Sequence, residues 1–281
     1  MKTILIPTDF SANALHALKY AQAVYKCDRV CFFILHAYGD EVYAAHNADP
    51  DSDLGLIKRE IRQRAEQELD QLLDSVIGLP PNPLHNFELI ATMDSLVDGV
   101  NGLVEEMNMD LVIMGTQGET SDYKSSFGSK TVEVFKYVKC PVLAVPMNYE
   151  PSRPKNILFP TDYMVPYKRR ELKLLDDLGG EFKSKIHCLY ITDFDELAPR
   201  QLDNRKFLEL SLSRSYLSFG TAPVKNRAEV ILEQIESNQA DLLVMVNSRH
   251  SFIEDMLYRS TVDLMALKLN IPLLVMQNLF R

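Results

Sequence analysis

The chain carries the same series of short motifs twice, and this internal repeat limits its possible folds more than any other feature. The segment ILIPTDF at residues 4–10 recurs as ILFPTDY at 157–163, which is 153 residues later. Two further segments of the first copy, at 109–114 and 140–145, recur in the same order 131 residues later. Three ordered matches with one consistent deletion of 22 residues indicate a duplicated domain.

The duplication predicts two domains of similar architecture. The length of 281 residues agrees with this, because single domains are commonly about 100–200 residues long. We expect the first domain at residues 1–147 and the second at 154–281. The intervening segment is polar and contains a proline, as expected for a linker.

Each copy alternates short apolar runs with amphipathic stretches. The apolar runs are continuous, as in parallel strands that are buried on both faces. In the first copy we expect strands at about 3–7, 29–36, 85–91, 110–115 and 141–146, and helices at about 11–26, 52–77, 95–107 and 129–138. In the second copy we expect strands at about 155–160, 185–191, 216–221, 241–246 and 272–277. The alternation predicts two tandem α/β domains, each a doubly wound five-stranded parallel sheet.

Composition and charge exclude several classes of protein. No apolar run reaches the ~18 residues of a membrane helix, and the first residues lack the features of a signal peptide. Four cysteines in a chain of this length do not form a disulfide framework. The net charge is −9 and neither half is basic, so charge gives no indication of nucleic-acid binding. We therefore expect a cytoplasmic protein with no membrane or nucleic-acid partner.

A glycine-rich loop follows the fourth predicted strand of the first copy. It reads Gly115-Thr116-Gln117-Gly118, and after nine intervening residues Gly128-Ser129 opens the next helix. Glycine permits a positive φ and a close approach of backbone to ligand. A helix N-terminus offers unpaired N–H groups to a phosphate, and the Ser129 hydroxyl can cap the helix or contact that phosphate. The spacing therefore indicates a phosphate-binding loop.

These motifs resemble the ATP-binding branch of the universal stress protein family, over essentially the whole chain and in both copies. The resemblance rests on Pro7-Thr8-Asp9, Leu35-His36-Ala37, the glycine loop and Cys140-Pro141-Val142. It implies a Rossmann-like fold similar to that of the adenine nucleotide alpha hydrolases. It also implies an ATP, with Mg²⁺, bound across the carboxyl ends of strands one and four.

The resemblance places adenine and ribose near Asp9 and the backbone of Ala37, and the phosphates near the glycine loop. It assigns to the nucleotide site Pro7, Thr8, Asp9, Ala37, Met114, Gly115, Gly118, Gly128, Ser129, Lys130 and Thr131. Simpler interpretations stay open for several residues. Asp9 alternatively caps the following helix, Gly115 alternatively forms a strand-end turn, and Lys130 and Lys124 alternatively face solvent. His36 is more simply a core histidine with hydrogen-bond partners than a catalytic base.

The second copy keeps the predicted sheet but not the glycine loop. At the 131-residue offset, Gly115, Gly118 and Gly128 are replaced by Val246, Arg249 and Arg259, and only the serine remains, as Ser260. Side chains at these positions would block the approach of phosphates, so we expect no ATP there in the family's manner. The two arginines alternatively bind another anion.

The sequence is compatible with three functions. The first is an ATP-binding regulatory or stress-response module, and the second is a slow ATPase or adenylyl-transferring enzyme. The third is a scaffold that binds no nucleotide. The loop has no Walker-type Gly-Lys-Thr sequence, which weakens the enzyme hypothesis. Family members generally pair through the fifth strand, so the resemblance also implies pairing of the two domains within the chain, with a homodimer as a further possibility.

Overall fold

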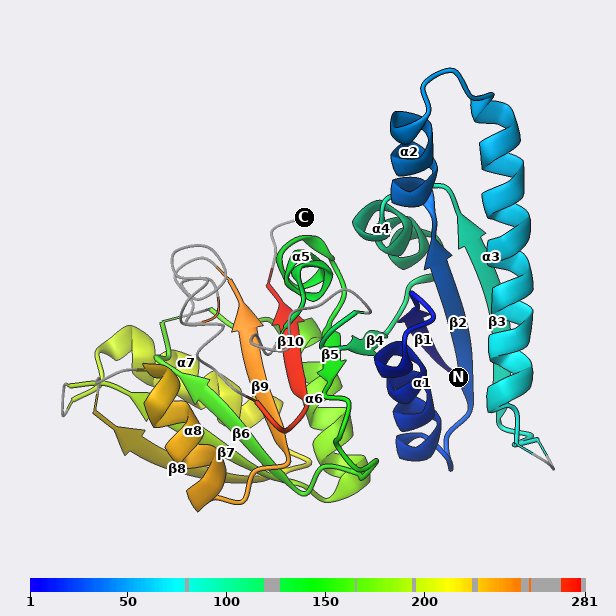
Figure 1. Cartoon of the computed structure of the whole chain (residues 1–281). Helices are drawn as coiled ribbons and strands as arrows, with labels where there is room; N and C mark the ends of the chain where they lie inside the picture. Colours follow the sequence, from blue (N-terminus) through cyan, green and yellow to red (C-terminus); the bar gives the residue numbers. More distant parts are fainter. Residues whose placement is uncertain are drawn as a thin grey trace. The chain divides into compact units, whose positions relative to one another are not determined.

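The computed structural model describes residues 1–78, 81–118, 127–164, 166–193, 196–223, 227–248, 253 and 269–278. These residues form two compact units (Figure 1). The first unit contains the described residues up to 118 together with 129–151. The second contains 127–128 and the described residues from 152 onward.

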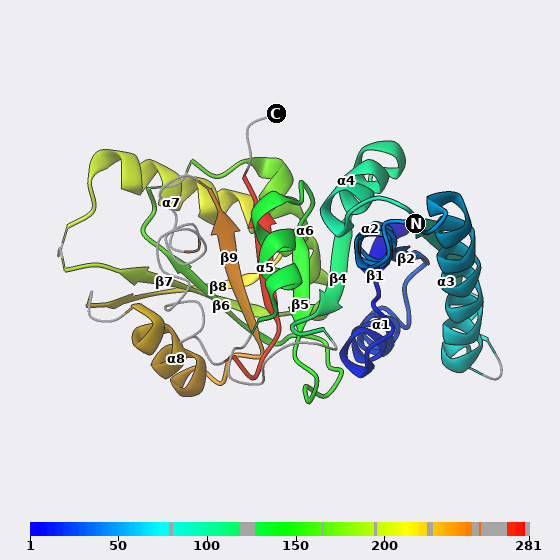
Figure 2. The same cartoon turned by 45° about the horizontal axis from the view of Figure 1, so that its top comes forward.

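The first unit is a five-stranded parallel sheet with helices on both faces. Its strands run in the order β3-β2-β1-β4-β5. In Figure 2, α1 and α4 lie on opposite sides of β4, as a doubly wound sheet requires. The elements are β1 (Lys2–Pro7), α1 (Ala12–Val24), β2 (Val30–Ala37), α2 (Gly39–Ala48), α3 (Leu54–Val76), β3 (His85–Thr92), α4 (Leu96–Met107), β4 (Leu111–Gly115), α5 (Ser129–Tyr137) and β5 (Val142–Val145).

The second unit repeats this arrangement. Its strands lie in the order β10-β9-β6-β7-β8, so that the first strand again lies between the second and the fourth. Its described elements are β6 (Asn156–Thr161), α6 (Arg169–Phe182), β7 (Lys185–Ile191), α7 (Pro199–Ser211), β8 (Tyr216–Ala222), α8 (Arg227–Ser237), β9 (Leu242–Asn247) and β10 (Leu273–Gln277). The predicted fold class, two tandem doubly wound α/β domains, is confirmed.

The predicted strands agree with the observed ones to within one residue at every end, and the predicted helix at 52–77 is α3. The sequence prediction missed α2. This helix is short and buries only Gly39 and Val42, so it carries little of the periodic apolar pattern that reveals a helix. It packs on α3 through a small cluster of Tyr38, Val42, Ile61 and Ala65.

Helix α3 is long because it has a regular apolar face. Ile61, Ala65 and Leu69 follow one another at intervals of four residues and are all buried. Asp53 caps the helix through a hydrogen bond from the Gly55 N–H to its side chain (2.8 Å). Most of the exposed residues of the helix are charged or polar, which is the pattern of a helix that covers one side of a sheet.

An aspartate ties the first strand to the fourth in each unit. In the first unit, Asp110 Oδ2 accepts hydrogen bonds from the Thr3 N–H (2.9 Å) and hydroxyl (3.2 Å). In the second unit, Asp241 accepts from the N–H groups of Lys155 (2.8 Å) and Asn156 (3.0 Å). Burial raises the pKa of Asp241, and its backbone donors oppose that shift. Asp110 and Asp241 are separated by the repeat offset, so the two units share this contact at the amino ends of their strands.

The cysteines behave as the sequence indicated. All four are free thiols, and Cys27 alone is exposed. Burial raises the pKa of Cys31 to about 11 and that of Cys188 to about 12, which keeps both thiols protonated at neutral pH. In the described part of the chain, no helix combines the length and the apolar character that crossing a bilayer requires.

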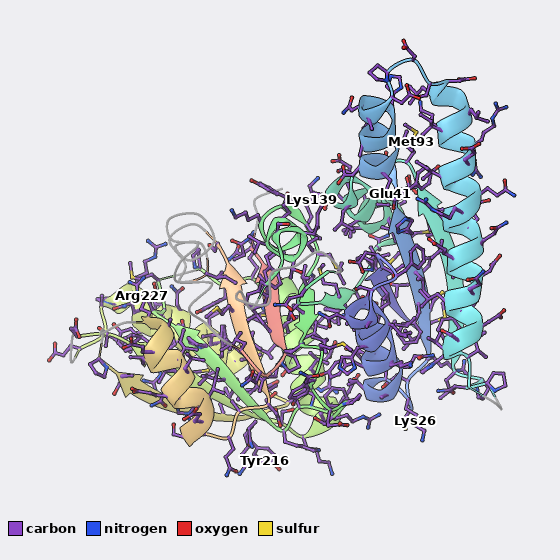
Figure 3. The ribbon with its side chains drawn as sticks, viewed as in Figure 1. Lys26, Glu41, Met93, Lys139, Tyr216 and Arg227 are labelled. Carbon is purple, nitrogen blue, oxygen red and sulfur yellow. The ribbon has the colours of Figure 1, made fainter. Side chains whose placement is uncertain are left out.

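The turn from β2 into α2 passes close to the end of β3. The Tyr38 N–H donates to the Thr92 carbonyl (2.9 Å) and the Gly39 N–H donates to the Asp94 carbonyl (3.2 Å). A Cβ at Gly39 would lie 2.3 Å from the Met93 carbonyl oxygen, a backbone atom. Figure 3 shows Met93 and Glu41 at this end of the unit. A glycine at position 39 therefore fixes where α2 begins.

We expect Gly39→Ala to destabilise the first unit by about 1–3 kcal/mol, because the added methyl group must displace backbone. Gly102→Ala is the matched control, since position 102 lies within α4 and has nothing within 4 Å of its Cβ position. That change is expected to stabilise by roughly 0.5–1 kcal/mol. Denaturant unfolding followed by circular dichroism measures both, and an unaltered midpoint for Gly39→Ala would contradict the assigned contact.

Candidate functional site

The candidate site lies where the strand order of the first unit reverses, between β1 and β4. In open α/β sheets, ligands bind beyond the carboxyl ends of the strands at this position. Asp9 follows β1, and Gly115 is the last residue of β4. The loops after these two strands are therefore the ones that a bound ligand would contact.

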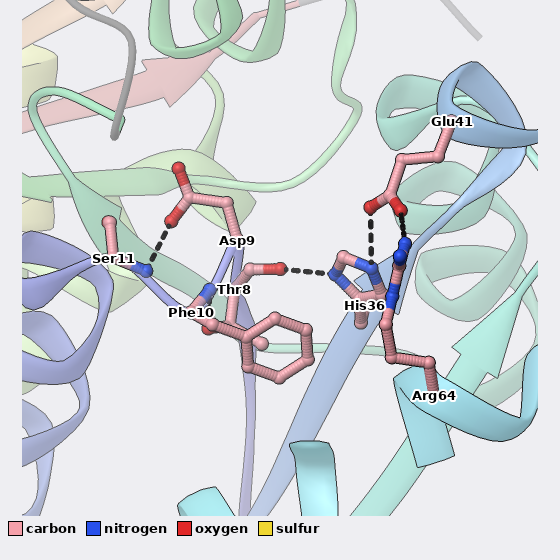
Figure 4. A network of polar contacts seen from close by, with 7 residues as sticks. All are labelled: Thr8, Asp9, Phe10, Ser11, His36, Glu41 and Arg64. Atoms are coloured by element: carbon pink, nitrogen blue, oxygen red, sulfur yellow. Dashed lines mark hydrogen bonds and ion pairs between the residues drawn. The ribbon is translucent and has the colours of Figure 1, made fainter. Parts of the chain in front are cut away.

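The loop after β1 is fixed by hydrogen bonds within a few residues (Figure 4). Thr8 is buried, and its Oγ1 accepts from the Phe10 N–H (3.0 Å). Asp9 is exposed, and its Oδ1 accepts from the Ser11 N–H (3.1 Å). Ser11 in turn caps α1 by accepting from the Ala14 N–H (3.2 Å). Ser11 is therefore the N-cap of α1, and the Asp9 carboxylate is not needed for that role.

Phe10 has a left-handed backbone, with φ of 62°. A bulky side chain rarely adopts this conformation, and such strain often marks functional loops. Tyr163 has the equivalent position in the second unit and a φ of 56°. Phe10 packs on His36 with ring centroids 4.5 Å apart, and Tyr163 packs on Tyr190 at 5.2 Å. The strained aromatic residue is therefore a shared feature of the two units that the motif comparison did not identify.

His36 is buried and both of its ring nitrogens have partners. Nδ1 lies 2.9 Å from the Thr8 carbonyl oxygen, and Nε2 lies 3.2 Å from Glu41 Oε1. Glu41 also pairs with Arg64 of α3. Each ring nitrogen therefore has an oxygen atom within hydrogen-bond distance. The interpretation of His36 as a histidine with satisfied hydrogen bonds agrees with these contacts.

The glycines of the loop after β4 permit close approach rather than an unusual backbone. A Cβ at Gly118 would lie 2.6 Å from Asp9 Oδ2, and a Cβ at Gly115 would lie 2.7 Å from Asn13 Cγ. In the part of the chain that the structure describes, no glycine has a positive φ. Of the two properties that glycine offers, a positive φ and a close approach, Gly115 and Gly118 therefore use the close approach. Because these glycines have no side chain, Asp9 can lie beside Gly118 and Asn13 beside Gly115.

Asn13 is a member of the site that sequence reasoning missed. It lies in the first turn of α1 and is 8% exposed. Its Nδ2 donates to the Gln117 carbonyl (3.0 Å), which ties α1 to the glycine loop. Its Oδ1 is buried and has no hydrogen-bond partner among the described residues. A polar residue on the buried face of α1 was the available signal.

Helix α5 carries the remaining candidate residues. Thr131 is buried, and its hydroxyl lies within hydrogen-bond distance of the carbonyl oxygens of Gly115 (3.2 Å) and Thr116 (3.1 Å). Ser129, the first residue of α5, and Lys130 are both exposed. Lys130 Nζ lies 2.7 Å from Asp40 Oδ2, and its hydrogen bond with Asp40 is the main cause of its raised pKa. Lys130 is therefore held by an ion pair and does not simply face solvent.

The structure thus brings most of the predicted residues to one edge of the sheet. Pro7 and Ala37 end β1 and β2, and Met114 is buried in β4. Asp9 meets Gly118, and Gly115 meets Thr131. Gly128 directly precedes α5 in the chain. Lys124 lies outside the described residues.

The corresponding edge of the second unit is occupied by side chains of that unit. Tyr167 is buried and its hydroxyl bonds to Thr161. Gln201 of α7 donates to the Asp162 carbonyl (2.7 Å) and lies 3.0 Å from the Tyr190 hydroxyl, and Asn204 donates to the Tyr163 carbonyl (2.7 Å). At the position equivalent to Gly115, β9 has the buried side chain of Val246. The residues Arg249, Arg259 and Ser260 lie outside the described part of the chain.

Comparisons with known proteins identify the family to which the chain belongs. The sequence model of the universal stress protein family matches residues 1–146, and the chain belongs to this family. It is 26% identical over 164 residues to a universal stress protein of Methanocaldococcus jannaschii, an alignment that covers 51% of this chain and 81% of the relative.

Solved structures share the complete two-unit fold. A universal stress protein from Archaeoglobus fulgidus aligns over 98% of both chains with a TM-score of 0.71 and 18% identity. A functionally unknown protein from Pseudomonas aeruginosa aligns over 99% of this chain and 92% of its own, with a TM-score of 0.57 and 14% identity. At these identities the likeness concerns the fold and not the ligand.

The Thr131 hydroxyl is expected to hold the end of β4 in place. Thr131→Val removes the hydroxyl while keeping the shape, and leaves buried carbonyl oxygens with one donor fewer, so we expect a loss of about 1–3 kcal/mol of stability. Thr131→Ser is the control, because it keeps the hydroxyl and loses one methyl group, which costs about 0.8 kcal/mol. Urea denaturation compares the three proteins, and equal midpoints for valine and threonine would contradict the role of the hydroxyl.

Proposed function

We propose that this protein binds one ATP, together with Mg²⁺, in its first unit and acts as a regulatory or stress-response module. The observation that carries the proposal is the close approach of the glycine loop to the loop after β1. Gly118 has no room for a Cβ beside Asp9, and Gly115 has none beside Asn13. Together these loops and the start of α5 form a cradle for a phosphate-bearing ligand at the point where doubly wound sheets bind nucleotides.

The residues present suit an adenine nucleotide. Asp9 offers an exposed carboxylate after β1, and the backbone at Ala37 ends the neighbouring strand β2. The N–H groups at the start of α5, with the hydroxyl of Ser129, are suited to phosphate oxygens. Within the described ranges the buried Asn13 Oδ1 lacks a hydrogen-bond partner, so it is an acceptor that a bound ligand could use. These residues would hold and orient the nucleotide.

The second unit is proposed not to bind ATP in the same manner. Gln201 and Asn204 hydrogen-bond to the loop after β6, and Tyr167 is buried against it. These contacts use the backbone carbonyls and the space that an adenosine would need. Anion binding by Arg249 and Arg259 remains a separate hypothesis.

Nucleotide occupancy would change the surface that the first unit presents to a partner, which is the regulatory role proposed here. There are two alternatives to this role. One is an enzyme that slowly hydrolyses ATP or transfers adenylyl groups, and the other is a scaffold that binds no nucleotide. A cytoplasmic location, pairing of the domains through their fifth strands and a possible homodimer also remain predictions. None of them is needed for the binding proposal.

Calorimetric titration of MgATP into the nucleotide-free protein tests the proposal. We expect one site per chain in the wild type and no measurable binding by Gly118→Arg, because there is no room for a side chain beside Asp9 and an arginine would displace the loop. Gly102→Arg is the matched control, since position 102 is exposed and has nothing within 4 Å of its Cβ position. It should bind ATP as the wild type does.

The remaining outcomes separate the alternatives. A folded wild type that does not bind ATP would exclude the proposal and leave the scaffold. Two sites per chain would contradict the assignment to the first unit alone. Release of phosphate during prolonged incubation, lost in Gly118→Arg but kept in Gly102→Arg, would favour the enzyme.

A further inference from the structure

An ion pair bridges the carboxyl edge of the first sheet above β1. Lys130 lies in the first turn of α5, which follows β4, and Asp40 lies in the first turn of α2, which follows β2. Their charged atoms are 2.7 Å apart. Because β1 lies between β2 and β4, this pair joins the two elements that flank the loop carrying Asp9.

We propose that Asp40 lowers the affinity of the site for phosphate-bearing nucleotides relative to nucleosides, by competing with phosphate for Lys130. In the free protein Asp40 is the partner of Lys130. When a nucleotide binds, its phosphate takes the place of Asp40. The inference rests on the proposed nucleotide site. It adds a specificity-determining residue that lies outside the glycine loop.

The energetics permit this exchange. The Lys130 and Asp40 side chains are 53% and 61% exposed, and exposed ion pairs contribute little to stability, so the pair is readily given up. A di- or triphosphate carries more negative charge than one carboxylate and is therefore the stronger partner for an ammonium group. Lys130 also lies 3.5 Å from Glu133 on its own helix, and that contact does not involve α2.

The neighbouring contacts of α2 explain why Asp40 remains at the site after the exchange. Glu41 binds His36 and Arg64, and Gly39 is fixed against the end of β3. The first turn of α2 is therefore anchored independently of Lys130. Once Lys130 contacts phosphate, Asp40 stays close to the same anion and opposes it. A ligand without phosphate neither breaks the pair nor meets this repulsion.

The test measures the affinities of ATP and adenosine for four proteins. Asp40→Asn is expected to bind ATP about three- to fivefold more tightly than the wild type, since an exposed charge pair has an effect of this size. Lys130→Met is expected to bind ATP more weakly. Adenosine, measured directly or by displacement of ATP, should bind all four proteins equally. The gain in Asp40→Asn should shrink at high salt, because salt screens exposed charges.

Glu105→Gln is the fourth protein and the matched control. It breaks the Lys139–Glu105 pair, which has a separation of 2.6 Å and an exposure similar to that of the Lys130–Asp40 pair but belongs to α4 and the segment after α5. Its affinity for ATP should equal that of the wild type. A gain equal to that of Asp40→Asn would show a general charge effect and overturn the inference.

The two proposals fail in different ways. If the wild type binds ATP and Asp40→Asn binds it no more tightly, the role of Asp40 is refuted while the nucleotide site stands. An equal change for ATP and adenosine in Asp40→Asn would indicate an altered fold around α2 and also refute the role. If the folded wild type and Asp40→Asn both fail to bind ATP, the proposed function fails and the inference fails with it.

Discussion

The approach of two loops at the carboxyl ends of β1 and β4 is the contact on which the candidate site depends. Gly118 has no space for a side chain beside Asp9, and Asn13 fills the space beside Gly115 while it holds the Gln117 carbonyl. Thr131 adds a hydrogen bond from α5 to the end of β4. A larger residue at either glycine would separate the loops, and the ends of α1, β4 and α5 would no longer converge on one point.

Much of this arrangement could be predicted from the sequence because it follows from repetition and regular periodicity. The continuous apolar runs located the strands, and the offset between the copies matched β1 with β6 and β4 with β9. The strand β8 was also placed correctly, although serine, glycine and threonine interrupt its apolar residues. The glycine loop could be located because its glycines have a characteristic spacing and lie between a predicted strand and a predicted helix.

The remaining features depend on contacts that a linear pattern does not contain. The ion pair of Lys130 with Asp40 joins residues 90 positions apart and involves a helix, α2, with too little apolar character to be recognised. The strain of the loop after β1 lies in Phe10, an aromatic residue, and not in a glycine. Asn13 was missed because its position on the buried face of α1 does not by itself reveal its contact with the glycine loop, 104 residues away.

The aspartates that tie the first and fourth strands, Asp110 and Asp241, lie at the amino ends of these strands, opposite the candidate site. In each unit, therefore, contacts at the amino edge hold the sheet together, whereas residues at the carboxyl edge can change without affecting these contacts. After duplication, substitutions at the carboxyl edge of the second unit could remove a ligand site without weakening the contacts that define the sheet. A parallel sheet of this kind separates the inheritance of architecture from the inheritance of chemistry, because the two units share one strand order and differ in the loops at the carboxyl edge.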